Sequence, residues 1–330
     1  MIAAMLAVLA CTVVYAVVAP RVAPLIDPAV AVRMLVPASA VFAAAGSFAI
    51  AVAAFTLVGQ FPEIAEMGRW SPATLRADAP IPPAAAGAGI VLLAYATISG
   101  VVLVSRRSRA LIEVHRSCGR LGSPGSVVIL ESDTPNAFTT PEITGRIIVT
   151  RGMLDALAPE ERQALLAHEA SHLRHRHAWW LFVADLAASI NPVLRPTARS
   201  LRQTVERWAD EDAVDAIRDR RTVAHAVARA ALAAHAHRNQ TAPTTAATSG
   251  DVPARVAALL APRVRRARPV LAAIATSVLL LTTTGAATLA VQRDGERLFE
   301  RVIAAHDHSA DATSTARHII ANEETGRHLR

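Results

Sequence analysis

The stretch LLAHEASHL, residues 165–173, carries the pattern His-Glu-x-x-His within a run of leucine and alanine. On a helix, His168 and His172 are four residues apart, so both imidazoles project from the same face. Two imidazole nitrogens on one face can hold Zn²⁺ at about 2.0–2.1 Å each. Glu169 then lies beside the ion and can take a proton from a water molecule. The pattern predicts a zinc site with a general base next to it.

The sequence before this pattern favours a helix. Pro159 suits a first helical turn, and Glu160 and Glu161 are favourable near the positive end of the helix dipole. The alternative is a chance match, because the chain contains 12 histidines. We prefer the metal site, since a buried His-Glu-His cluster without a metal ion would be costly to desolvate.

A third metal ligand is needed if the zinc ion is catalytic, together with one open position. The stretch VERWADEDA, residues 205–213, places Glu206 and Asp210 four residues apart on a second helix. We expect Glu206 to reach the metal and Asp210 to orient a ligand histidine. A solvated acidic helix face is the alternative. It suits Glu211 and Asp212, but it agrees less well with Glu206, whose apolar neighbours indicate a half-buried helix.

Together the two motifs resemble those of the gluzincin membrane peptidases of families M48 and M56. Further similarity lies upstream, in NAFTTP at residues 136–141 and GRIIVTRGML at residues 145–154. The dipeptide Asn191-Pro192 is similar to that of the BlaR/MecR-type M56 branch. The resemblance covers about residues 133–216 and the arrangement of apolar spans. It implies that the region of Asn136 contacts substrate; that Asn136 only caps a turn is an open alternative.

Hydrophobic residues make up 52% of the 330 residues and are clustered. Four stretches, at about 1–20, 34–62, 84–105 and 269–291, are long enough to cross a hydrocarbon core of about 30 Å. The first is interpreted as a transmembrane helix rather than a signal peptide, because it lacks a basic n-region. The net charge of +7 is expected of a protein with basic residues flanking its spans, so we predict no nucleic-acid partner.

Arginines mark the orientation of the chain. They follow the third span at residues 106–109 and precede the fourth at residues 263–268. By the positive-inside rule both ends face the cytoplasm. The region 1–105 is therefore predicted to hold three transmembrane helices, 106–268 a cytoplasmic zinc domain, and 292–330 a short extracytoplasmic tail.

Within the zinc domain, residues 126–130 and 146–150 are predicted strands, because β-branched residues cluster between turn residues. An edge strand near the zinc ion could pair with an extended peptide substrate. His175 and His177 alternate with arginine, which indicates a polar or interfacial face. Residues 178–190 are apolar but too short for a span, so we interpret them as a buried or membrane-lying helix.

The predicted fold class is mainly α: a polytopic helical membrane protein with a zincin-like α+β metallopeptidase domain between its third and last transmembrane helices. The predicted function is a zinc metalloendopeptidase of the cell membrane, acting on a protein or peptide substrate at the cytoplasmic face. Resemblance to M56 implies a regulatory repressor as substrate, and resemblance to M48 implies quality control of membrane proteins.

Two rival interpretations stay open. One is a zinc-binding signal transducer with little proteolysis, and the other is a structural membrane protein with an accidental motif. The tail 292–330 is far too small for the penicillin-binding sensor domain of BlaR-type receptors, which argues against β-lactam sensing. Expected partners are the substrate and the lipid bilayer, and the sequence does not predict an oligomeric state.

Overall fold

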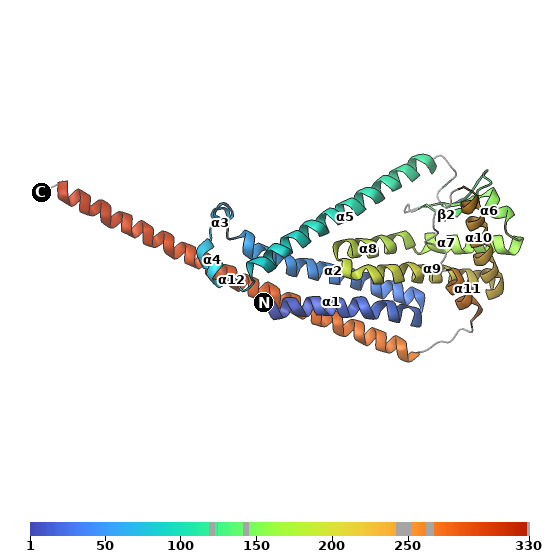
Figure 1. The fold of residues 1–330 in the computed structure, drawn as a ribbon, viewed down its shortest axis with the longest axis horizontal. Helices are drawn as coiled ribbons and strands as arrows, with labels where there is room; N and C mark the ends of the chain where they lie inside the picture. Colours follow the sequence, from blue (N-terminus) through green and yellow to red (C-terminus); the bar gives the residue numbers. More distant parts are fainter. Residues whose placement is uncertain (119–122, 124, 141–144, 242–251, 262–266, 329–330) are drawn as a thin grey trace. The chain divides into compact units, whose positions relative to one another are not determined.

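The computed structural model describes residues 1–118, 123, 125–140, 145–241, 252–261 and 267–328 (Figure 1). Two compact units divide the chain. One consists of residues 1–14, 41–98 and 278–330, and the other of residues 15–40 and 99–277. The predicted arginine cluster before the last apolar helix lies largely outside the described residues, as do residues 141–144 of the predicted upstream similarity.

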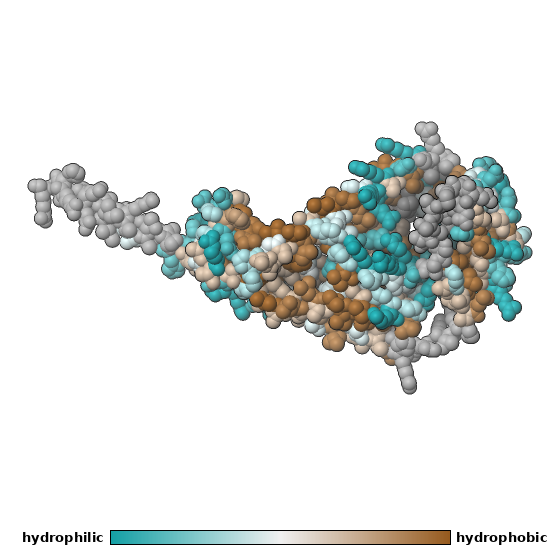
Figure 2. Space-filling model, in the orientation of Figure 1, coloured by the Kyte–Doolittle hydropathy of each residue, from teal (hydrophilic) through white to brown (hydrophobic). Residues whose placement is uncertain are grey.

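Among the described residues, four helices are long and apolar enough to cross a membrane. They are α1 (Ile2–Val22), α2 (Pro28–Val58), α5 (Pro83–Cys118) and α12 (Ala267–His328). Figure 2 shows apolar residues gathered on the surface over α1, α5 and α12. The chain is therefore a mainly helical, multi-pass membrane protein, as the sequence predicts.

The helix boundaries differ from the predicted spans at several ends. Helix α2 begins at Pro28 and ends at Val58, whereas the prediction was 34–62. Helices α5 and α12 continue well past the predicted ends at residues 105 and 291. Charged residues end an apolar span, but they are compatible with a helix, so the backbone continues beyond the apolar segment.

In the first unit, two short helices follow α2: α3 (Pro62–Gly68) and α4 (Pro72–Asp78). Each has a proline at its start, where the missing amide hydrogen has no helical partner to lose. The indole of Trp70, between them, donates to the carbonyl of Gly59 at 2.8 Å. Its ring packs edge-on against Phe55 and Phe299, with centroids 5.8 Å away in each case.

The second unit contains a three-stranded sheet of order β1-β3-β2, formed by β1 (Val127–Leu130), β2 (Ala137–Thr139) and β3 (Ile147–Thr150). Strand β3 pairs parallel with β1 and antiparallel with β2. All four residues of β3 are buried, because this strand is central and its faces are covered. Both predicted strands are confirmed, and β2 is an edge strand that contacts the helix carrying the His-Glu-x-x-His pattern.

Besides parts of α1, α2, α5 and α12, the described residues of this unit form six further α-helices. They are α6 (Arg151–Asp155), α7 (Pro159–Arg174), α8 (His177–Ile190), α9 (Arg195–Ile217), α10 (Arg220–Thr241) and α11 (Val252–Leu260), with 3₁₀ turns at Ala23–Leu25 and Pro192–Leu194. Helix α7 packs against α9 and α10, and α10 packs against α11. The two predicted motif helices, α7 and α9, therefore lie side by side.

Helix α7 begins where the sequence predicts. Pro159 is its first residue, and the carboxylate of Glu161 accepts the backbone N–H of Ala158 at 2.9 Å. That carboxylate is buried and also pairs with Arg229 of α10 at 3.1 Å. A carboxylate at this position satisfies an otherwise unpaired amide and favours the positive helix end. The contact with α10 fixes the start of α7 within the unit.

Candidate metal centre

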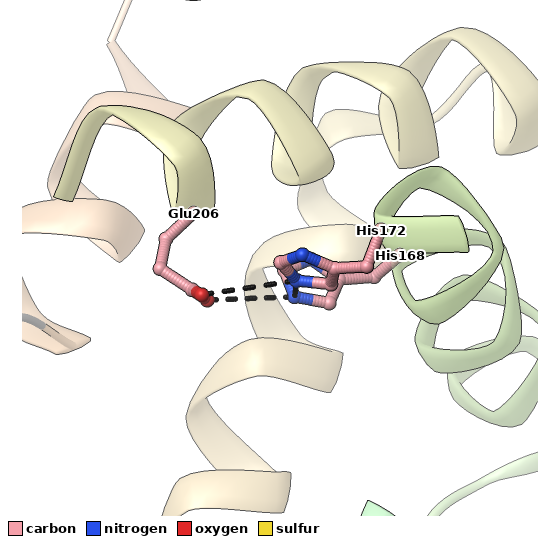
Figure 3. A group of neighbouring side chains, drawn as sticks. All are labelled: His168, His172 and Glu206. Atoms are coloured by element: carbon pink, nitrogen blue, oxygen red, sulfur yellow. Dashed lines mark hydrogen bonds and ion pairs between the residues drawn. The ribbon is translucent and has the colours of Figure 1, made fainter. Parts of the chain in front are cut away.

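Helices α7 and α9 bring three predicted metal ligands together (Figure 3). The Nε2 atoms of His168 and His172 are 3.2 Å apart. Glu206 of α9 faces both of them: its Oε2 lies 3.5 Å from His168 Nε2 and its Oε1 lies 3.7 Å from His172 Nε2. Because residues four apart on α7 share a face, the two imidazoles converge on one point opposite α9.

These separations fit a metal ion. Ligand atoms at about 2.0–2.2 Å from a tetrahedral zinc centre lie about 3.4 Å from one another. The two histidine nitrogens are 3.2 Å apart, and each lies 3.5–3.7 Å from one of the two oxygens of Glu206, which is close to that value. Two imidazoles and a carboxylate are also the donor set of catalytic zinc sites that leave a fourth position open. The residues present therefore suit zinc in both chemistry and spacing.

The electrostatics of the centre favour a positive charge. Burial works to lower the pKa of His168, but Asp210 and Glu206 outweigh it and raise the pKa to about 10. Burial works to raise the pKa of Glu206, but His168 and Arg255 outweigh it and lower the pKa. His172 behaves differently, because burial lowers its pKa to about 4 and leaves it neutral. Two carboxylates thus stabilise a cationic charge at this point, which is where the ligand atoms converge.

Asp210 lies against the far side of His168. Its Oδ1 is 3.0 Å from His168 Nδ1, and only 4% of its side chain is exposed. When a metal ion displaces the proton on Nε2, this contact would keep the remaining proton on Nδ1. The structure thus brings Asp210 into contact with His168. That Asp210 orients a ligand histidine stays a prediction.

Glu169 and Asn136 line the same cavity, of about 230 Å³, together with His168 and Glu206. Glu169 is 8% exposed, and its pKa is raised mainly by burial. A carboxylate with a raised pKa accepts a proton more readily near neutral pH, as a general base must. The catalytic role of Glu169 stays a prediction.

Asn136 immediately precedes the edge strand β2. Its backbone N–H donates to Thr150 Oγ1 at 2.9 Å, and its carbonyl accepts the Thr150 N–H at 3.0 Å. Asn136 therefore helps to end the sheet and also borders the cavity, so the two interpretations of this residue are compatible. Contact with a substrate stays a prediction.

Sequence reasoning missed Arg255 of α11. Its guanidinium forms two bonds with Asp210, at 2.8 and 2.6 Å, and its Nη1 lies 3.0 Å from Glu206 Oε2. Arginine is well suited to such a paired contact because its planar fork matches a carboxylate. Arg255 thus compensates the two carboxylates that face the histidines, and it borders the cavity.

The variant Arg255→Gln is expected to lower the melting temperature of the protein, and to lower it more without zinc than with zinc. Removing one partner of a buried ion pair costs about 3–5 kcal/mol, because the remaining charge is uncompensated. A bound zinc ion would supply part of the missing positive charge. Thermal unfolding in detergent, with and without added zinc, measures the effect.

Arg220→Gln is the matched control, because Arg220 pairs with Glu211 away from the ligand cluster. An equal decrease with and without zinc would contradict this account.

The sequence predicts a polar or interfacial face for His175 and His177, and for His177 this prediction is wrong because its side chain is buried. His177 is 1% exposed, and its Nδ1 lies 2.9 Å from His172 Nδ1. Its ring also packs on Trp208 of α9, with centroids 4.7 Å apart. His175 stacks on Trp208 and bonds Asp212 at 2.8 Å. The cause is Arg176, whose left-handed conformation (φ 52°) turns the chain sharply at the start of α8.

His177 consequently contacts the second predicted ligand. Burial, above all, lowers the pKa of His177 to about 3, so its imidazole is neutral. A neutral Nδ1 can accept the Nδ1–H of His172, which would leave His172 Nε2 directed at Glu206. Asp212 was predicted to be solvated, but it also accepts the hydroxyl of Ser171 at 2.7 Å. His177 and Asp212 thus both link α7 to neighbouring helices around the metal centre.

Comparison with known proteins identifies a similar segment. Residues 104–191 match the family described as Peptidase family M48. A Protease HtpX homolog of Methanocaldococcus jannaschii is 37% identical over 113 residues, which are 30% of this chain and 39% of that protein. A homolog from Acidiphilium cryptum is 38% identical over 90 residues, 26% of this chain and 31% of the relative. Protease HtpX of Legionella pneumophila is 46% identical over 61 residues, 17% and 21% of the two chains.

The chain thus spans well under two thirds of each relative. No solved structure matches it significantly. The matched family segment includes both histidines and Glu169, and it ends before Glu206. The resemblance to M48 is confirmed in that segment, and the similarity to M56 stays a prediction.

Proposed function

We propose, on the premise that residues 104–191 belong to peptidase family M48, that this membrane protein is a zinc-dependent endopeptidase. The observation that carries the proposal is the convergence of His168, His172 and Glu206 within 4.8 Å of one another. The cavity beside them is lined by a buried glutamate and bordered by an edge strand. These are the parts that hydrolysis of an extended peptide requires.

In this proposal each residue has a separate task. His168, His172 and Glu206 hold zinc, which when bound supplies a Lewis acid that polarises the scissile carbonyl and makes water more acidic. Glu169 takes the proton of the attacking water and passes it to the leaving amine. Asp210 holds His168 in the orientation that presents Nε2. Strand β2 offers backbone groups to the peptide, with Asn136 at its end.

Among substrates, we favour misfolded or damaged membrane proteins over a dedicated repressor. The match to M48 supports this choice, because the resemblance to that family implies quality control. The relatives carry the name protease as well. A repressor substrate rests on the similarity to M56 alone.

The zinc domain is proposed to face the cytoplasm. Helix α5 carries Arg106, Arg107 and Arg109 directly after its apolar stretch, as expected of a cytoplasmic helix end. Reporter fusions at residue 150 test this orientation. A cytoplasmic reporter should be active there, and an active periplasmic or external reporter would refute the orientation without affecting the metal centre.

The experiment for the function itself uses the full-length protein in lipid vesicles and a mixed-sequence peptide library. New N-termini detected by mass spectrometry, abolished by a chelator and restored by zinc, are the expected result. A zinc-binding signal transducer with little proteolysis would instead bind zinc stoichiometrically and generate no new N-termini.

A further inference from the structure

Helix α8 has an unusual distribution of side chains for a helix in a water-soluble domain. Its buried residues are small or polar: His177, Ala184, Asp185, Ala187 and Ala188. Two of its large apolar residues, Trp180 and Leu181, are half-buried on the same side as these residues. The other five lie on the opposite face, at spacings of three, four and seven: Trp179, Phe182, Val183, Leu186 and Ile190. We call these five residues the outer stripe. A helix surrounded by water would bury its large apolar side chains instead.

The outer stripe is partly uncovered. Trp179 is 49% exposed, and its ring packs edge-on with that of Phe182, with centroids 5.9 Å apart. From Trp179 to Ile190 the stripe extends about 16 Å along the helix, at 1.5 Å per residue. An apolar surface of this length needs an apolar environment.

The stripe is continuous with a membrane-spanning helix. A Cβ placed on Gly100 of α5 would lie 3.8 Å from both Leu186 and Ile190, so these side chains lie next to α5 inside its apolar stretch. Further along α5, Arg107 pairs with Asp185 at 3.0 Å. The carboxylate of Asp185 also pairs with Arg202 of α9, so its charge is compensated.

These two contacts also give α8 a direction. Gly100 of α5 lies next to Ile190 of α8, and Arg107, further along α5, pairs with Asp185, which is earlier in α8. The two helices therefore run in opposite directions. The first turn of α8 therefore lies toward the arginine-rich end of α5, where the apolar stretch ends. Tryptophan is enriched at this level of a membrane, because its ring is apolar and its N–H is polar.

Positive charge gathers at the same end. Arg174 and Arg176 flank the turn from α7 to α8, and a surface hollow of about 410 Å³ lies beside it. That hollow is lined by His175, Arg176, Trp179, Trp180 and Val183. Arginine beside tryptophan is the combination that anionic phospholipid headgroups attract.

We propose that α8 lies in the lipid bilayer boundary, with the part of its outer stripe that α5 does not cover against acyl chains and the α7–α8 turn against an anionic phospholipid headgroup. The occupant of both surfaces is the same lipid leaflet. The arrangement holds the C-terminal end of α7, and thus the metal centre, at the membrane surface. It does not depend on whether the protein hydrolyses peptides.

Spin labels test the stripe. In a background of Cys11→Ser and Cys118→Ser, single cysteines replace Phe182 or Val183 and carry a nitroxide in vesicles of phosphatidylcholine and phosphatidylglycerol. Leu92→Cys on α5 is the lipid control, and Leu232→Cys on α10 is the exposed control, at 52% and 67% exposure. We expect the stripe labels to collide with oxygen more than with a water-soluble nickel complex, as at Leu92. Collision with nickel as at Leu232, or low collision with both, would overturn the proposal.

A second measurement tests the headgroup contact. The double variant Arg174→Gln/Arg176→Gln and the wild type are extracted from these vesicles, and the retained phosphatidylglycerol is measured by mass spectrometry. Arg221→Gln, an exposed position on α10, is the matched control. We expect the double variant to retain at most half the phosphatidylglycerol of wild type and control. Equal retention in all three proteins would refute the headgroup site.

Discussion

The variant Glu169→Gln is expected to lower the rate of peptide hydrolysis about 10²–10⁴-fold, which is the usual contribution of a general base. Glutamine keeps nearly the same shape but accepts no proton at its amide nitrogen. The three ligand side chains are unchanged, so the zinc content should stay that of the wild type. The measurement is the initial rate on the peptide library together with zinc per chain.

Glu160→Gln is the matched control for this variant. Glu160 is exposed in the first turn of the same helix and lies away from the cavity. It should keep full activity. If Glu169→Gln were as active as the wild type, Glu169 would not be the base. If a biological signal persisted in Glu169→Gln without hydrolysis, the signal-transducer interpretation would replace the enzyme.

The second large effect is expected from Glu206→Ala. Replacing a residue that hydrogen-bonds to a metal ligand typically weakens metal binding about 10–100-fold. Removing a direct ligand should weaken zinc binding by more than that. The purified variant should therefore hold clearly less zinc than the wild type after dialysis. Glu206 comes from a different helix than the histidines, so α7 itself should remain intact.

Glu211→Ala is the control on the same helix, since Glu211 pairs with Arg220 rather than with the histidines. It should keep the zinc content of the wild type. Equal zinc in the wild type and in Glu206→Ala would keep the metal centre and reject Glu206 as its third ligand. Asp210 would then be the next residue to replace, because it contacts His168.

Local sequence patterns predicted much of this fold. The start of α7 at Pro159 follows from proline and two glutamates, and strands β1 and β3 follow from clustered β-branched residues. The four apolar helices follow from hydropathy and length. Four-residue spacing within α7 and within α9 also predicted which side chains share a face, and the structure brings those faces together.

Contacts between distant segments could not be predicted in this way. Arg255 is 45 residues from Asp210, and nothing in local spacing relates the two. His177 is only five residues from His172, but the sharp turn at Arg176 reverses the expected direction of its side chain. Helix ends were also misplaced, because hydropathy marks the end of an apolar span rather than the end of a helix.

The most direct test of the metal centre and its chemistry is a zinc titration of the metal-free, full-length protein in lipid vesicles, with hydrolysis of the peptide library measured at each step. Our account predicts that activity rises with added zinc and reaches a plateau at one zinc ion per chain. Absence of stoichiometric zinc binding, or hydrolysis that is independent of zinc, would contradict it.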